Sequence, residues 1–236
     1  MLCKLVFRLL IVGAFSTTFA FAQSLAPAGS KTLLVDRPAS NDPIMMVKVI
    51  EGATDLKSDG HEYPNKSVWE SVFTAGDDWL KDLSFTIKNV SEKTVIYVVV
   101  GCGLYETGDW KAELAKHQTI PLVGSASNVV GRRPDEALYS ASLGRRLKPD
   151  SARAPFELAP GQEFTMPVES PADYEALRSR IEEKQPMSSV TACNGGISQV
   201  FFQDGTQWQG HHYLRADLER PGRWVRMSFE EWSGSH

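Results

Sequence analysis

The sequence predicts a mainly β protein, folded as a sandwich of two antiparallel sheets. Three observations lead to this fold class. Short runs of residues alternate between apolar and polar, turn residues separate consecutive runs, and only one segment is a convincing helix. We expect about seven to nine strands in all.

The composition is that of an ordinary globular chain. Of the 236 residues, 42% are hydrophobic and 23% are charged. These fractions exclude a largely disordered or collagen-like chain. The 25 basic residues face 29 acidic ones, a balance that does not favour nucleic acid as a partner.

Residues 1–22 are predicted to be a secretory signal peptide. Lys4 and Arg8 precede an apolar stretch that ends at Phe21, and Ala20 and Ala22 supply an Ala-x-Ala cleavage pattern. The stretch is too short for a transmembrane helix, which needs about 20 apolar residues. We therefore expect cleavage after Ala22 and a secreted or periplasmic protein that does not span the membrane.

Residues 23–42 are small, polar and interrupted by prolines, which predicts a flexible leader in which 32–35 can pair as a short strand. Residues 43–236 are then expected to form a single β-sandwich domain. Its first strand begins at Ile44, where alternation starts.

The clearest strand signal lies between residues 82 and 105, where two consecutive strands are expected to form a hairpin. Leu83, Phe85 and Ile87 alternate with polar residues, as in a strand buried on one face. After a polar turn, residues 94–100 form a β-branched run typical of a central strand buried on both faces. A long irregular insertion, about 106–155, follows this hairpin, and such insertions are often functional.

The next elements are an edge strand and the single helix. Alternation over residues 164–168 predicts a strand, and Pro167 places it at a sheet edge. Ser170 as N-cap and Pro171 at the first helical position begin a helix that runs to about residue 184.

The C-terminal part reads as hairpins. Residues 189–193 and 197–203 are predicted strands separated by Asn194-Gly195-Gly196. Asp204-Gly205 predicts a type I′ turn, in which both residues have positive φ. Alternation from 224 to 229 predicts the last strand.

Two motifs resemble the immunoglobulin-like domains of exported bacterial proteins. The segment Leu83–Ser91 is followed by a β-branched strand, and the segment Leu158–Phe164 leads into the next strand. The resemblance covers about half of the chain and implies an immunoglobulin-like sandwich, which by itself implies no function. Unlike antibody-type domains, neither cysteine lies where a buried Trp would pack on a bridge between the sheets.

A disulfide between Cys102 and Cys193 is expected. Cys3 leaves with the signal peptide, so an even pair remains in an oxidising compartment. Two separate buried thiols are the alternative. The bridge would stabilise the fold by roughly 4–5 kcal/mol in the chain-entropy model.

One candidate binding region is a local excess of positive charge inside the insertion, formed by Arg132, Arg133, Arg145 and Arg146. Such a cluster suits an anionic partner. The alternative is a solvated loop.

A second candidate binding region is the aromatic hairpin near the C-terminus, represented by Trp208 and Tyr213. Aromatic side chains of this kind are enriched at interfaces. The alternative is that they belong to the core.

The chain shows no catalytic signature. It lacks a Gly-x-Ser-x-Gly motif and a phosphate-binding glycine-rich loop. His211 and His212 are adjacent, and neighbouring side chains on a strand point to opposite faces, so the two do not readily bind one metal. We therefore assign no catalytic residue, no metal and no cofactor.

The function expected from the sequence is that of an exported binding or interaction module, with a protein or glycan of the cell envelope as partner. One alternative is an envelope hydrolase that uses a carboxylate with His61, His117, His211 or His212. This alternative requires a histidine within hydrogen-bond reach of an Asp or Glu in a pocket. The other alternative is a structural subunit, which requires an exposed apolar patch or an unprotected sheet edge.

Overall fold

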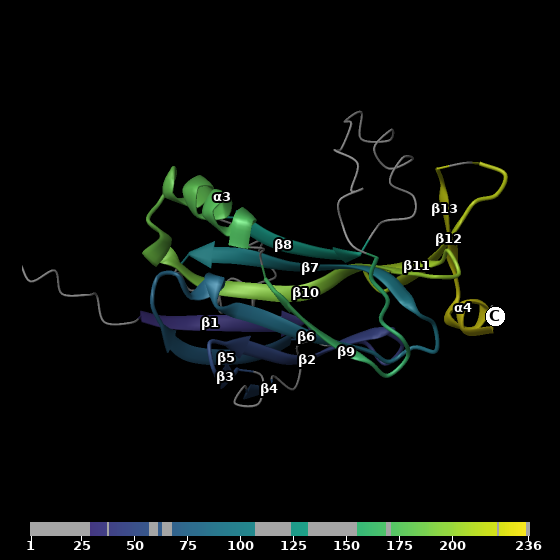
Figure 1. Ribbon diagram of the computed structural model, residues 1–236, viewed down its shortest axis with the longest axis horizontal. Helices are drawn as coiled ribbons and strands as arrows, with labels where there is room; N and C mark the ends of the chain where they lie inside the picture. Colours follow the sequence, from purple (N-terminus) through teal and green to yellow (C-terminus); the bar gives the residue numbers. More distant parts are fainter. Residues whose placement is uncertain are drawn as a thin grey trace, which may run out of the picture.

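The computed structural model describes residues 29–36, 38–56, 61–62, 68–106, 124–131, 155–168, 171–220 and 222–234. These residues form two β-sheets that share one hydrophobic core (Figure 1). The predicted mainly β, two-sheet architecture is confirmed.

The larger sheet has nine strands, ordered β13-β12-β11-β10-β1-β5-β4, with β7 pairing to β10 and β8 pairing to β7. Its strands are β1 (Gly29–Asp36), β4 (His61–Glu62), β5 (Val68–Ala75), β7 (Val95–Glu106), β8 (Gly124–Gly131), β10 (Val190–Phe202), β11 (Gln207–Gln209), β12 (His212–Ala216) and β13 (Trp224–Met227).

The smaller sheet has four strands, ordered β3-β2-β6-β9. They are β2 (Ile44–Glu51), β3 (Thr54–Asp55), β6 (Leu83–Asn89) and β9 (Glu163–Pro167). β9 lies at an edge of this sheet, as Pro167 predicts, because proline cannot donate a hydrogen bond to a further strand.

Within the predicted leader, the short strand expected over 32–35 forms and is longer than expected, since β1 covers Gly29–Asp36. This strand lies inside the larger sheet, antiparallel to β5 and parallel to β10. The pairing with β10 also corrects the expectation of purely antiparallel sheets. Leu33 and Val35 are 1% and 3% exposed, and burial of these side chains holds the segment in the sheet.

The insertion predicted as irregular over 106–155 contains a strand. β8 pairs along eight residues with β7, from Gly124 opposite Leu104 to Gly131 opposite Tyr97. Its sequence, GSASNVVG, is rich in small residues and carries no clear alternation, which is why the pattern did not reveal it. The rest of the insertion between 107 and 154 lies outside the described residues.

The two strands expected over residues 83–100 form, but the predicted hairpin between them is wrong. β6 pairs with β2 and β9 in the smaller sheet, whereas β7 pairs with β10 and β8 in the larger sheet. The polar turn between them therefore connects the two sheets. Leu83, Phe85 and Ile87 on β6 are fully buried. On β7, the neighbours Tyr97 and Val98 are both buried although they point to opposite faces, as expected of a strand inside a sheet.

β10 is continuous through Asn194-Gly195-Gly196, where the sequence predicted a break. Each glycine makes room for a side chain from another element. A Cβ on Gly195 would lie 2.6 Å from Cζ of Phe85 in the opposite sheet, and one on Gly196 would lie 2.5 Å from the Asp36 carboxylate. The glycines therefore permit close packing without ending the strand.

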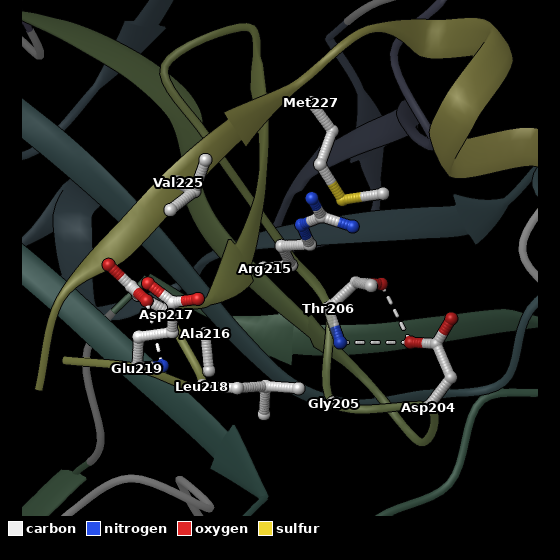
Figure 2. A pocket seen from close by; sticks show the side chains of 10 residues that line it. All are labelled: Asp204, Gly205, Thr206, Arg215, Ala216, Asp217, Leu218, Glu219, Val225 and Met227. Atoms are coloured by element: carbon white, nitrogen blue, oxygen red, sulfur yellow. Dashed lines mark hydrogen bonds between the residues drawn. The ribbon is translucent and has the colours of Figure 1, made fainter. Parts of the chain in front are cut away.

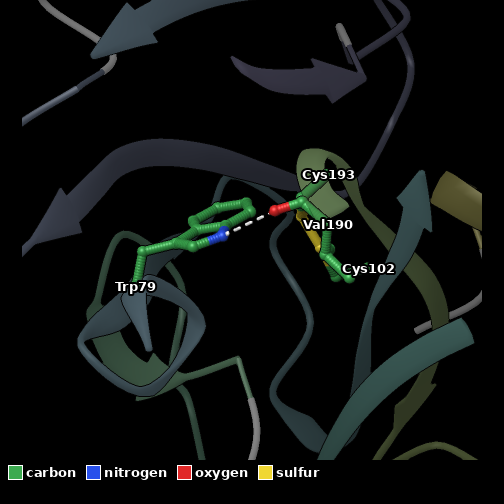
Figure 3. Close-up of a disulfide and its surroundings, with 4 residues drawn as sticks. All are labelled: Trp79, Cys102, Val190 and Cys193. Atoms are coloured by element: carbon green, nitrogen blue, oxygen red, sulfur yellow. Dashed lines mark hydrogen bonds between the residues drawn. A yellow bond between two sulfur atoms is a disulfide. The ribbon is translucent and has the colours of Figure 1, made fainter. Parts of the chain in front are cut away.

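Cys102 and Cys193 form the expected disulfide, with Cα atoms 5.9 Å apart (Figure 3). The bridge joins β7 to β10 within one sheet, and both cysteines are buried. Beside it, Nε1–H of Trp79 donates a hydrogen bond of 3.2 Å to the Val190 carbonyl. Trp79 belongs to the 3-10 helix η1 (Trp79–Lys81).

The predicted helix is confirmed as α3 (Pro171–Glu182), which lies against β8. Its apolar stripe of Tyr174, Leu177 and Ile181 is buried. The Tyr174 hydroxyl also donates a hydrogen bond of 2.9 Å to Asp78. The short 3-10 helix η2 (Met187–Ser189) then leads into β10.

Two predictions for the C-terminal part need correction. The hairpin at Asp204-Gly205 forms, but among its two central residues only Gly205 has positive φ, so the turn is not type I′. The last strand stops at Met227, and a second helix, α4 (Phe229–Gly234), begins where a strand was expected. Ser228 and Glu231 exchange side-chain-to-backbone hydrogen bonds in a capping box that starts this helix.

Candidate functional site

The candidate site is the end of the molecule formed by β11, β12 and β13 with their connecting loops, residues 207–227, which we call the C-terminal arm. β1 and β11 pair with the same side of β10: β1 pairs with its residues 192–195, and β11 pairs further along with its residues 199–201. The sheet therefore continues from β10 into the arm, away from β1 and β5 (Figure 1). α4 and the loop around Asn41 pack at this end.

Trp208 and Tyr213, predicted as contact residues, are core residues of the arm. Their exposed fractions are 4% and 5%. The Tyr213 ring stacks on Trp232 of α4 at 4.3 Å, and its hydroxyl donates a hydrogen bond to the Asn41 carbonyl. Burial, followed by the nearby Asp42 carboxylate, raises the pKa of Tyr213 above its usual range, so the phenol remains a proton donor. The aromatic side chains of this hairpin therefore pack in the core, and we no longer propose that they bind a partner.

A histidine–carboxylate pair lies at the turn between β11 and β12. Nδ1 of His211 is 3.1 Å from both carboxylate oxygens of Asp42. Asp42 is 8% exposed and also accepts a hydrogen bond of 2.7 Å from the Ala39 amide. His211 has a φ of 65°, the left-handed region that non-glycine residues rarely adopt. The ring also meets Trp208 edge to face.

The sequence did not point to this pair because 169 positions separate Asp42 from His211. Nothing local marks Asp42, which follows Asn41 in a segment read as leader. The fold brings the pair together because β1 and β10 are neighbours in the sheet, which places the loop after β1 beside the arm.

Two surface hollows flank Met227 of β13. The larger, about 750 Å3, lies between the arm and the turn at Asp204–Thr206 (Figure 2). The smaller, about 480 Å3, lies where the end of β13 meets Asn41 and His211.

The two hollows differ in charge. The larger is lined by three acidic residues, Asp204, Asp217 and Glu219, and one basic residue, Arg215. Burial by itself would raise the pKa of Asp204, but hydrogen bonds from Lys93 and Thr206 outweigh it, and the pKa is lowered. The carboxyl is therefore charged at neutral pH.

The smaller hollow has the opposite character. Among the described residues, its lining contains one arginine and two histidines and no carboxylate. These residues are Asn41, His211, His212, Tyr213, Arg226, Met227, Ser228 and Phe229. This contrast lies within a chain of net charge −4.

The other predicted residues fall elsewhere. The basic cluster Arg132, Arg133, Arg145 and Arg146 lies outside the described residues, as does His117. His61 belongs to β4, far along the sheet order from the arm. Within the described ranges, no three His, Cys, Asp or Glu side chains gather so that they could hold a metal ion.

One buried charge lies apart from the arm. Lys31 on β1 is 2% exposed, and its Nζ donates a hydrogen bond of 3.1 Å to the Val190 carbonyl. Burial lowers the pKa of Lys31, opposed by the attraction of Asp77. Because its Nζ is buried and held by a backbone carbonyl, we assign Lys31 a structural position.

Comparisons of the chain with protein-family models, curated proteins and solved structures give no match. The immunoglobulin-like resemblance therefore stays a prediction. A search of the described helices finds none that combines the length and apolar character of a membrane span.

Proposed function

We propose that this protein is an exported binding module that acts without catalysis or a cofactor. Its proposed contact surface is the C-terminal arm, and its proposed partner is an envelope protein that contributes an extended segment with apolar and basic side chains.

The observation that carries this proposal is the clustering of exposed apolar side chains. The described residues include five exposed large hydrophobic side chains, and two of them, Leu218 and Val225, line the larger hollow together. Leu218, in the loop between β12 and β13, is 95% exposed. Isolated exposed apolar residues are ordinary, but a local group marks an interaction site.

The sheet edge supports a protein partner. β13 is the last strand of the larger sheet and pairs only with β12 among the described strands. An unpaired edge offers backbone hydrogen bonds to an extended segment of another chain. The acidic lining of the larger hollow, next to Leu218 and Val225, suits basic side chains on that segment.

The test is a peptide-display selection on the mature protein, followed by calorimetric titration of the selected peptides. We expect selected peptides that combine Lys or Arg with apolar residues. Leu218→Ser should weaken their binding about tenfold or more, because it removes an apolar contact. Val72→Ser is the matched control: Val72 is 59% exposed on β5, so its loss should leave binding unchanged.

Other outcomes decide against the proposal. No enriched peptide, or equal weakening by both substitutions, would exclude the arm as the contact surface. Concentration-dependent self-association that Leu218→Ser abolishes would favour the alternative of a structural subunit. Export is tested separately by the mass of protein recovered outside the cytoplasm, which should begin at Gln23.

A second candidate is an envelope hydrolase, favoured by one observation. His211 lies within hydrogen-bond distance of Asp42 and lines a hollow, as that alternative requires. A panel of ester, glycoside and phosphate substrates tests this candidate. Turnover that His211→Ala abolishes would support hydrolysis, and absence of turnover on every substrate class would count against it.

A further inference from the structure

We infer that the smaller hollow is a binding site for a carboxylate-bearing sugar, separate from the protein-docking surface proposed above. This site uses Arg226, His211 and Asn41 around a partly apolar floor. The inference does not depend on the proposed function, because it rests on the side chains of Arg226, His211 and Asn41, whereas the docking surface rests on Leu218, Val225 and the backbone edge of β13.

The first step is the permanent charge at the site. Arg226, on β13, is exposed and makes no ion pair with any described residue. In the part of the chain that the structure describes, no acidic side chain lines the hollow. A planar guanidinium with unused donors is suited to bidentate binding of a carboxylate.

The second step is the orientation of His211. Nδ1 faces the buried Asp42 carboxylate, so the proton on this nitrogen is donated to Asp42 and Nε2 is left for a ligand. The same carboxylate is held by the Ala39 amide, which fixes the pair as a unit. The left-handed backbone at His211 is the kind of local strain that persists where the surroundings hold a residue in place, as at ligand sites.

The third step concerns Asn41. Its carbonyl accepts the Tyr213 hydroxyl, which ties the loop to β12. Its side-chain Oδ1 accepts a hydrogen bond from the Ser40 hydroxyl, and the Nδ2 amide group can act only as a donor. Arg226, His211 and Asn41 therefore bring polar side chains from three separate segments to the lining of one hollow.

The charge of the hollow and its apolar lining residues indicate which class of ligand it binds. Among the described residues of the lining, Arg226 supplies the one permanent positive charge, and a single positive charge matches a monoanionic carboxylate better than a phosphate with nearly two negative charges. Phe229, 37% exposed, and Met227 add an apolar surface on which the C–H face of a sugar ring can pack.

The test is a titration of 15N-labelled mature protein with sodium glucuronate, with glucose as the neutral match. We expect saturable shifts at His211 and Arg226 with glucuronate and much weaker binding of glucose. Arg226→Gln should weaken glucuronate binding about tenfold or more, because a charge-assisted pair is lost. Arg215→Gln is the matched control: Arg215 is also an exposed arginine of the arm but lines the other hollow.

Three outcomes would overturn the inference. They are equal binding of glucose and glucuronate, equal weakening by the two arginine substitutions, and tighter binding of inorganic phosphate or of N-acetyl-diglycine, a peptide carboxylate. Leu218→Ser, which tests the docking surface, should not alter glucuronate binding, so failure of one proposal is distinguishable from failure of the other.

Discussion

Substitution of Gly195 by alanine tests how closely the two sheets pack. An added Cβ would lie 2.6 Å from Cζ and 3.1 Å from Cε1 of Phe85, which is fully buried between the sheets. Carbon atoms pack at about 3.5–4.0 Å, so the ring or a strand must move by roughly 1 Å. Overpacking of this kind costs about 1–3 kcal/mol of unfolding free energy.

The assay is urea unfolding of the mature protein, read by tryptophan fluorescence. We expect Gly195→Ala to lower the midpoint with an unchanged m-value. Gly101→Ala is the matched control on β7: its nearest neighbour would be the Ala126 carbonyl oxygen at 4.0 Å, an ordinary contact. That variant should be neutral or slightly more stable, because alanine reduces the entropy of the unfolded chain.

A second substitution isolates the contact. Phe85→Leu removes the ring that the new methyl group would meet, so it should cost less in the Gly195→Ala background than in the wild type. The coupling in this double-mutant cycle should be about 1 kcal/mol or more. Wild-type stability of Gly195→Ala, or an absence of coupling, would refute the reasoning.

Three further predictions concern the bridge, the buried lysine and the histidine pair. Replacing both Cys102 and Cys193 by alanine should lower the unfolding free energy by roughly 4–5 kcal/mol, less any strain released. The intact mass of the wild-type protein should show that two hydrogens are missing. Two free thiols in the wild-type protein would contradict the bridge. The pKa of Lys31 is lower in the folded protein than in the unfolded chain. At pH values between these two pKa values, the unfolded chain therefore binds a proton that the folded protein lacks. The free energy of unfolding should rise with pH in this range. Lys31→Met should remove this rise, and an identical pH profile in the variant would show that another group causes it. Asp42→Asn and His211→Ala should be coupled by about 0.5–1 kcal/mol in unfolding experiments, and strictly additive losses would mean that the pair does not stabilise the loop.

The sequence pattern predicted those strands and helices in which buried residues recur at a regular spacing. Leu83, Phe85 and Ile87 revealed β6 because one face of that strand is entirely apolar. The cap and stripe of α3 revealed the helix for the same reason. For β1 the sequence indicated only a short strand over 32–35, because only Leu33, Leu34 and Val35 mark it and the residues around them resemble a loop.

The glycines show why strand boundaries were harder to predict. Gly195 and Gly196 looked like a break in the chain, because glycine commonly marks a turn. Their actual role depends on Phe85 and Asp36, which approach from other elements. No local signal distinguishes a glycine that bends a strand from one that admits a neighbouring side chain.

By itself, the sequence determined the mainly β class, the helix, the two central strands β6 and β7 and the cysteine pair, because each follows from periodicity, capping or residue type over a short stretch. It did not determine that β6 and β7 belong to different sheets. Only the tertiary structure decided where the candidate site lies. It turned Trp208 and Tyr213 inward and brought Asp42 to His211. It also separated the acidic lining from the basic one around Met227. The physical reason is that a site requires several side chains to converge, and their convergence depends on strand order in the sheet rather than on distance along the chain.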